Sequence, residues 1–271
     1  MRARHVEVVR DGSFAWIWMN RPERRNALSL EHLQDLLDAV RTVGESDARG
    51  VVLGGRGPVF SAGHDFADVV DADYPDVRAL LETCTELCET MLVIPQPVVA
   101  RVHGLATAAG CQLVATADLA VAAESAAFAV PGGSGGWFCH TPMVAVGRAV
   151  GRKRAVEMAF TGDRIDARTA ADWGLVNRVV PDADLDAATL DLLERATRGS
   201  AASKALGKQT LYRQLGLDLP DAYRLAGEAM ARASQIPDAR EGMRAFLEKR
   251  PPAFGPAPQP DPADGRPTDR G

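Results

Sequence analysis

Two short segments of this 271-residue chain combine residue types that could stabilise a negatively charged oxygen. The first is Phe60-Ser61-Ala62-Gly63-His64-Asp65, and the second runs from Gly104 to Gln112 and includes the expected start of a helix. Small side chains let a ligand approach the backbone, and a helix start offers unpaired N–H groups with a favourable dipole. If the segments converge, their N–H groups could form an oxyanion hole for an enolate or a tetrahedral intermediate. Tight packing of a helix on a strand is the alternative explanation.

Other short patterns do not indicate a metal site or a nucleotide site. Cys84 and Cys88 are four residues apart in an expected helix, with no partnering Cys or His at ligand spacing nearby. We therefore expect a buried helix face there and no metal site. The run from Gly54 to Gly57 lacks the Lys-Ser/Thr ending of a phosphate-binding loop, and Gly104 to Gly110 does not match G-x-G-x-x-G. Neither a P-loop nor a dinucleotide site is supported.

Alternating strands and helices must position the two segments. The apolar and β-branched runs predict strands at residues 5–9, 14–19, 50–53, 98–102 and 119–123. Between them, Ser29 is the expected N-cap of an amphipathic helix, and further helices are expected at residues 76–93 and from about Ala108. This alternation indicates an α/β fold.

Beyond about Pro142 the pattern turns mostly helical. Helix-period apolar residues recur at residues 185–195, 201–215, 222–234 and 239–249. Residues 251–271 hold 7 of the 17 prolines and almost no large apolar side chains, which predicts a disordered tail. We therefore expect a core domain over residues 1–195, a helical region over 196–250 and the Pro-rich tail over 251–271.

The composition excludes several classes of protein. With 31 Lys and Arg against 36 Asp and Glu, the net charge of −5 argues against electrostatic binding of nucleic acid. The longest stretch without these charged residues, 102–117, is 16 residues long and contains polar side chains, too short for a membrane span. The first ten residues lack the apolar core of a secretory signal, and four cysteines do not make a disulfide scaffold. We expect a cytoplasmic protein with no nucleic-acid and no membrane partner.

Taken in order, several segments resemble the crotonase (enoyl-CoA hydratase/isomerase) superfamily. They are Asn20-Arg21-Pro22, Asn26-Ala27-Leu28-Ser29, Phe60 to Asp65, Gly104 to Leu113 with Asp118, Thr161-Gly162 and Ala170 to Val180. The resemblance covers about residues 5–250, and several motifs in the right order are more specific than any one of them. Leu105 to Leu113, Trp137 to Cys139 with Thr141-Pro142, and Gly207 to Leu215 are similar to the subgroup of enoyl-CoA hydratase domain-containing protein 3.

The resemblance implies a crotonase-like spiral of ββα units, followed by a helical region that builds homotrimers or homohexamers. It also implies an acyl-CoA ligand, so that coenzyme A arrives within the thioester substrate and no separate cofactor is needed. The oxyanion hole maps onto the backbone N–H groups of His64 and Ala109. The residues that map onto the coenzyme A site are Arg24, Arg25, Ala27, Ala62, His64 and Asp65. An ordinary solvated turn is the alternative for the two arginines, and Asp65 and Asp118 are interpreted as orienting loops.

The acid–base residues depart from the family pattern. Hydratases of this family use two glutamates, which the resemblance places at Gln112 and Gly132. General acid–base help is worth about 10²–10⁴-fold per group, so we expect little standard hydration without them. His140 lies where some dienoyl-CoA isomerases place a carboxylate and could carry a proton, or it could be a buried or interface histidine.

We therefore expect an acyl-CoA thioester enzyme of the hydratase/isomerase type. The alternatives are a decarboxylase or isomerase that uses other residues, or a non-catalytic acyl-CoA-binding protein.

Overall fold

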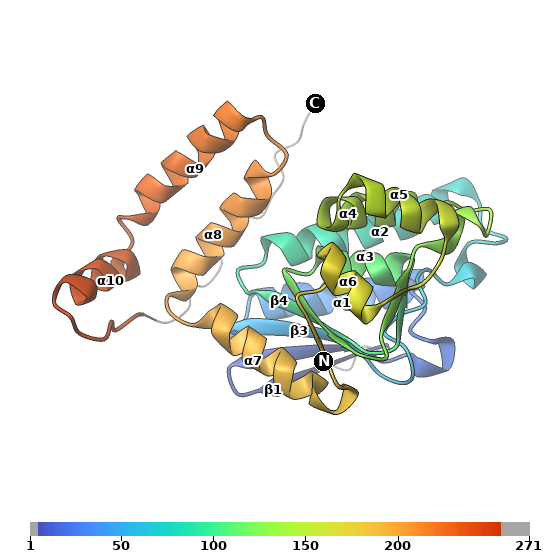
Figure 1. Ribbon diagram of the computed structural model, residues 1–271, viewed down its shortest axis with the longest axis horizontal. Coiled ribbons are helices and arrows are strands. Elements are labelled where there is room, and N and C mark those ends of the chain that lie inside the picture. The colour runs from blue at the N-terminus through green and yellow to red at the C-terminus, as the bar shows by residue number, and fades with distance from the viewer. Residues whose placement is uncertain (1–4, 256–271) are drawn as a thin grey trace.

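The computed structural model describes residues 5–255 and is built on a six-stranded sheet (Figure 1). Its spatial order is β1-β2-β3-β4-β6-β9. Strands β1 and β2 pair antiparallel, and every later pair in this sheet is parallel. The bounds are β1 (Val6–Asp11), β2 (Phe14–Met19), β3 (Gly50–Gly55), β4 (Val98–Val102), β6 (Leu119–Ala123) and β9 (Arg178–Val180). A smaller sheet joins β5 (Leu105–Thr107), β7 (Ala127–Ala129) and β8 (Ile165–Asp166).

Helices cover both faces of the main sheet. One layer contains α1 (Leu30–Gly44), α2 (Tyr74–Val93), α3 (Ala109–Thr116), α4 (His140–Val150), α5 (Arg152–Thr161) and α6 (Ala167–Trp173). The opposite face is covered by α7 (Leu185–Thr197) (Figure 1). Because successive strand residues point to opposite faces, Ile17 packs in the large core, whereas Trp16 and Trp18 pack in the cluster beside α7. The sheet thus lies between two apolar layers.

Local signals in the sequence correspond closely to the helix starts and strands. Ser29 is the N-cap of α1, and its hydroxyl oxygen accepts a hydrogen bond from the N–H of His32 at 3.2 Å. The expected strands at 98–102 and 119–123 have the observed bounds. Cys84 and Cys88 are buried on α2, as expected. These elements confirm the predicted α/β class.

Beyond about Pro142 the described chain is mostly helical, as expected, although the short strands β8 and β9 were not predicted there, nor was β7 before it. Strands β7, β8 and β9 are two or three residues long. Such short strands show no periodicity of their own and form because a distant partner pairs with them, as β9 does with β6.

Three helices follow α7 and extend away from the core (Figure 1). They are α8 (Ala201–Gln214), α9 (Leu219–Ala233) and α10 (Pro237–Leu247). Helix α8 packs against α2 and α9. Residues 251–255 form neither helix nor strand, and the rest of the predicted tail lies outside the described residues. Within residues 5–255, every helix is too short or too polar to cross a membrane.

Candidate functional site

The two segments with small side chains lie side by side, beyond the carboxyl ends of β3 and β4. The N–H of Ser61 donates to the carbonyl oxygen of Leu105 at 3.2 Å, and the N–H of Thr107 donates to that of Ser61 at 3.0 Å. A Cβ on Gly110 would lie 2.6 Å from the carbonyl oxygen of Ser61, so only glycine fits this contact. Ligands of parallel sheets bind at this edge, beyond the carboxyl ends of the strands.

Among the backbone N–H groups of these segments that have no partner in the described residues, two lie where the segments meet. One belongs to His64 and the other to Ala109, the first residue of α3. A Cβ built on Gly63 would lie 3.2 Å from the Ala109 nitrogen, so this nitrogen adjoins the residue that precedes His64. Ala109 does not adopt a positive φ, whereas Ala108 does, at 50°. An alanine in that region stores about 1–3 kcal/mol of strain, and strained residues of this kind gather at active sites.

The first segment is fixed by charged and polar neighbours. The buried carboxylate of Asp65 accepts hydrogen bonds from Nη1 of Arg21 and Nη2 of Arg24, each at 2.9 Å. Burial raises the pKa of Asp65, but the hydrogen bonds from Arg24 and Ala67 outweigh it and hold the pKa below its ordinary value. The carboxylate of Asp65 therefore orients the loop by its hydrogen bonds to the two arginines and to the N–H of Ala67.

The remaining residues expected at the coenzyme A site lie either between β2 and α1 or within the first segment. Arg24 is half exposed beside Asp65, and Arg25 is exposed with no ion pair among the described residues. The carbonyl oxygen of Arg25 accepts the N–H of Ala62 at 3.0 Å. Ala27 is buried, and its carbonyl oxygen contacts Nδ1 of His32 at 3.1 Å. Both arginines thus border the site from its solvent side.

The two positions at which the resemblance predicts the hydratase glutamates differ from each other in their surroundings. Gln112 is buried on α3, with Nε2 3.4 Å from Sγ of Cys88 and Oε1 without a partner. Gly132 lies in a 3-10 turn, Pro131–Gly133, where an added Cβ would be 2.1 Å from the carbonyl oxygen of Trp137. Position 132 therefore has no room for a side chain unless the loop from 132 to 139 moves.

That loop brings Trp137 over the side chain of His64. Their ring centroids are 6.1 Å apart, and Trp137 is also 6.2 Å from the ring of Phe66. Both imidazole nitrogens of His64 are buried and have no hydrogen-bond partner among the described residues. Burial lowers the pKa of His64 to about 4. The carbonyl of Leu28 raises this pKa by a smaller amount, although it makes no hydrogen bond of ordinary geometry with the ring. The imidazole is neutral at pH 7.

His140 lies at the solvent side of this region. It is the first residue of α4 and is exposed, with its ring centroid 5.1 Å from that of Phe138. Of the two alternatives for this residue, the buried histidine is wrong for the single chain, because the side chain starts a helix at the surface, and the interface histidine stays a prediction. Trp137 was missed as a site residue. A single tryptophan after four glycines within residues 132–136 was its signal in the sequence.

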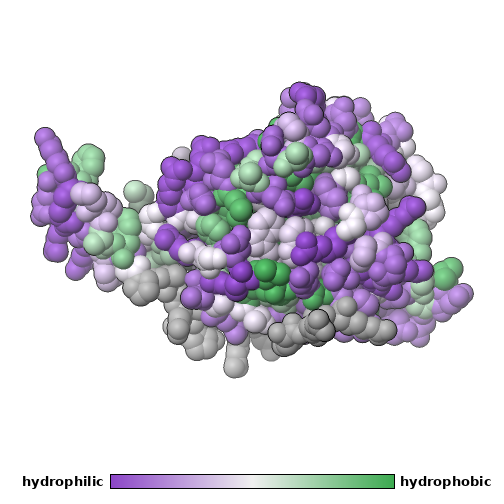
Figure 2. Space-filling model, turned by 90° about the horizontal axis from the view of Figure 1, so that it is seen from below, coloured by the Kyte–Doolittle hydropathy of each residue, from purple (hydrophilic) through white to green (hydrophobic). Residues whose placement is uncertain are grey.

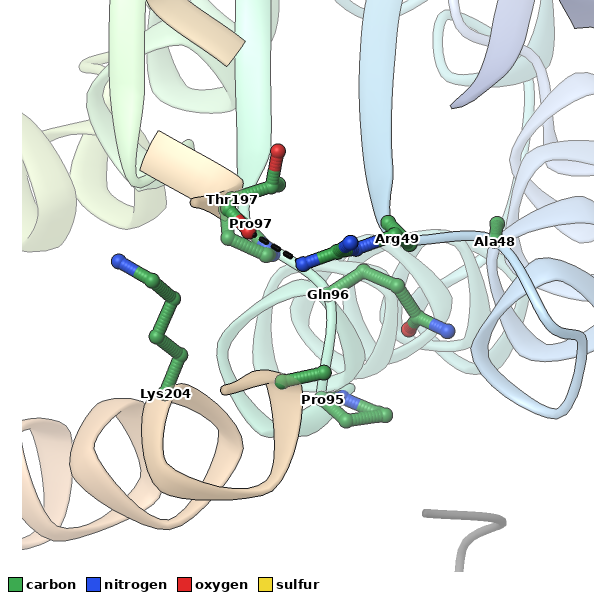
Figure 3. Close-up of a pocket in the computed structure, with 8 residues that line it drawn as sticks. Ala48, Arg49, Pro95, Gln96, Pro97, Thr197 and Lys204 are labelled. Carbon is green, nitrogen blue, oxygen red and sulfur yellow. Dashed lines mark hydrogen bonds between the residues drawn. The ribbon is translucent and has the colours of Figure 1, made fainter. Parts of the chain in front are cut away.

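A pocket elsewhere in the structure lies at the opposite edge of the sheet (Figure 3). It is lined by residues that precede β3 and β4 together with the end of α7 and the start of α8. Arg49 there donates to the carbonyl oxygen of Thr197 at 2.7 Å. Because this guanidinium is held by the end of α7, the pocket is interpreted as a junction between elements. Among residues 5–255, no group of three or more His, Cys, Asp and Glu side chains could hold a metal ion.

Comparisons with known proteins agree on one family. Residues 10–257 match the family model described as enoyl-CoA hydratase/isomerase. The mouse protein named "Enoyl-CoA hydratase domain-containing protein 3, mitochondrial" is 45% identical over 240 residues, which cover 88% of this chain and 80% of the mouse protein.

Solved structures match over nearly the whole chain. An enoyl-CoA hydratase from Mycobacterium smegmatis superposes with a TM-score of 0.89 at 43% identity, over 92% of this chain and 98% of that one. The human enoyl coenzyme A hydratase domain-containing protein 3 gives a TM-score of 0.88 at 39% identity, over 92% of this chain and 100% of that one. These matches confirm the predicted crotonase-like fold with its C-terminal helices.

Proposed function

Because the chain belongs to the enoyl-CoA hydratase/isomerase family, we propose that it binds an acyl-CoA thioester and stabilises its enolate. The observation that supports this best is the pair of unpartnered N–H groups of His64 and Ala109, on adjacent loops. Each such donor contributes about 3–4 kcal/mol when charge develops on the carbonyl oxygen. The α-carbon next to that carbonyl then becomes acidic enough to exchange or transfer a proton.

The reaction favoured by these residues is isomerisation rather than hydration. Gln112 cannot titrate, and Gly132 offers no side chain to activate water. A shift of a double bond needs no water and can use one proton carrier. Decarboxylation of an acyl-CoA would also need less proton abstraction, because carbon dioxide leaves instead.

A non-catalytic acyl-CoA-binding protein is the second candidate. Gln112 and Gly132 favour this candidate as well, because the hydratase acid and base are absent while the oxyanion donors are present. In either case Arg25, whose guanidinium is unpaired among the described residues, is proposed to contact the phosphates of coenzyme A, with Arg24, Ala27, Ala62 and Asp65 bordering that ligand.

The test is mass spectrometry of an acyl-CoA panel incubated with the protein in deuterated water. Saturated, enoyl, dienoyl and malonyl-type thioesters are included beside a buffer blank. Mass gain by water, loss of carbon dioxide or deuterium at carbon identifies hydration, decarboxylation or proton transfer. A silent panel in which the enoyl thioesters also keep the position of their double bond, together with micromolar acyl-CoA binding, would favour the binding protein. Absence of binding would contradict both candidates.

The oxyanion hole is tested separately at Ala109. Proline is tolerated at the first position of a helix and has no N–H, so Ala109→Pro removes the donor. We expect it to lower turnover by about 10²-fold or more. Ala109→Gly keeps the N–H and is the matched control, and thermal unfolding of both variants reports whether the fold is intact.

Assembly and location complete the proposal. We propose a homotrimer, or a homohexamer made of two such trimers. The reason is that α8, α9 and α10 expose large apolar side chains and extend from the core (Figure 1). The cytoplasmic location stays a prediction, and the mouse relative is named as mitochondrial.

A further inference from the structure

The imidazole of His64 is a buried polar group that the proposed oxyanion hole does not use. The hole needs only the backbone N–H of this residue, yet both ring nitrogens are buried and unpartnered among the described residues. A buried polar atom without a hydrogen-bond partner destabilises the folded chain. A neutral imidazole has one donor and one acceptor nitrogen, so a ligand in the site could satisfy both.

The position of the ring relative to a bound thioester follows from the backbone. If the N–H of His64 holds the carbonyl oxygen, the Cβ of the same residue is only two bonds from that nitrogen, so the imidazole is within reach of the thioester. Trp137 covers the ring with a centroid distance of 6.1 Å, and Phe66 lies beyond Trp137. The imidazole therefore lies beside an aromatic ring, and both of its nitrogens are shielded from bulk water.

We propose that the His64 imidazole carries the proton in a 1,3-shift of the double bond of an enoyl-CoA thioester. This inference rests on the proposed function, because it requires the thioester carbonyl to lie against the N–H groups of His64 and Ala109. It adds the proton carrier that Gln112 and Gly132 do not supply.

The chemistry balances without water or a redox partner. One imidazole nitrogen takes a proton from the α-carbon of a 3-enoyl thioester, and the electrons of that C–H bond form the dienolate while the carbonyl π electrons move to oxygen. The imidazolium then returns the proton to the γ-carbon. The dienolate collapses to the conjugated 2-enoyl thioester, and the imidazole is neutral again.

Neighbouring titratable groups are less suited to this step. Burial raises the pKa of the Cys111 thiol to about 12 and raises the pKa of Cys139, so neither forms a thiolate readily. Asp65 is held by Arg21 and Arg24. At pH 7 the His64 imidazole is neutral and has an acceptor nitrogen for the proton. Because burial lowers its pKa to about 4, the imidazolium forms only transiently, beside the negative charge of the dienolate.

The test compares His64→Gln with His140→Gln, using a 3-enoyl-CoA as the probe. His64→Gln keeps the backbone N–H, so acyl-CoA affinity is expected to change by less than about threefold while kcat falls about 100-fold or more. His140→Gln is the competing variant, since it removes the exposed histidine. Normal turnover in His64→Gln, or loss confined to His140→Gln, would overturn the proposal.

Binding separates this inference from the function on which it rests. If the wild-type protein binds acyl-CoA but does not shift the double bond, only the role of His64 fails. If it binds no acyl-CoA, both fail.

A second variant tests the covered position of the ring. In deuterated water, the wild-type protein should transfer most of the substrate's own proton, because Trp137 shields the imidazolium from exchange. Trp137→Ala should raise deuterium incorporation several-fold, about in proportion to solvent access. Phe160→Ala removes an exposed aromatic ring that has no ring contact with His64 and is the matched control. Equal incorporation in all three proteins would contradict a shielded proton carrier.

Discussion

At the scale of single residues, Gly132 determines how the loop closes over the site. An added Cβ there would meet the carbonyl oxygen of Trp137 at 2.1 Å and Sγ of Cys139 at 2.7 Å. The N–H of Trp137 donates to the carbonyl oxygen of Gly132 at 2.9 Å, so the loop is tied at the same point. The position of Trp137 over His64 thus depends on the absence of a side chain at residue 132.

We expect Gly132→Ala to lower the free energy of unfolding by about 2 kcal/mol, because backbone atoms must move to admit the methyl group. Gly135→Ala in the same loop is the control, since its Cβ would meet nothing closer than 3.7 Å. Urea unfolding followed by circular dichroism measures both. Equal stability of the two variants would show that the loop adapts freely at residue 132.

At the scale of elements, one buried ion pair fixes α8 to the core. Nζ of Lys208 lies 2.7 Å from Oδ2 of Asp118 and donates to the carbonyl oxygens of Met91 and Gln96 at 2.8 and 2.9 Å. The hydroxyl of Tyr212 donates to Oδ1 of Asp118 at 2.7 Å. Burial lowers the pKa of Lys208, and Asp118 opposes that lowering. The cluster joins α8 to residues that precede β4 and β6.

Lys208→Met should destabilise the protein by about 3 kcal/mol, because Asp118 would keep its place with its charge uncompensated. Lys204→Met, one turn earlier on α8, removes a lysine that has no ion pair among the described residues. Hydrogen exchange of α8 and thermal unfolding would locate the loss. If both variants unfold alike, the ion pair does not anchor the helix.

At the scale of the whole molecule, two buried imidazoles make the free energy of unfolding decrease at acid pH. Burial lowers the pKa of His32 and of His64 from 6.5 to about 4. Above pH 6.5 the folded and unfolded states are both neutral at these rings. Between pH 6.5 and 4 the unfolded state binds more protons, so stability falls by up to about 1.4 kcal/mol per pH unit for each histidine.

We therefore expect the free energy of unfolding to decline from pH 6.5 toward pH 4 and His32→Gln to reduce that slope. Urea titrations at fixed protein concentration across this range provide the measurement. A flat profile in the wild-type protein would contradict burial of neutral histidines.

The exposed apolar side chains of the C-terminal helices, and of the turn between α8 and α9, predict that the chain assembles into an oligomer. They are Leu211, Leu215, Leu217, Leu219, Tyr223, Met230, Met243, Phe246 and Leu247. Figure 2 shows hydrophobic groups among hydrophilic ones on the projecting end of the molecule. Such a surface on a projecting element is typical of an interface between subunits.

Sedimentation velocity should therefore give three or six times the chain mass of 28.9 kDa. Phe246→Asp places a charge on α10 at a side chain that is 82% exposed, and should shift the distribution toward smaller species. Val70→Asp, also at an exposed apolar residue but outside these helices, is the control. A single chain mass for the wild-type protein at micromolar concentration would exclude the proposed trimer.

The sequence by itself determined what depends on near neighbours. Apolar periodicity predicted the core strands and most helices, Ser29 marked the start of α1, and the small residues of two segments indicated where a ligand could approach the backbone. These signals are local, because a helix cap or a strand is specified within about ten residues.

Only the tertiary structure decided what those segments meet. Strands β7, β8 and β9 exist through pairing with distant partners, and the space beside Gly132 is occupied by atoms five to seven residues further along a glycine-rich loop. The contact between Trp137 and His64 brings together residues that are far apart in the chain. Such contacts depend on packing in three dimensions, which composition and periodicity do not specify.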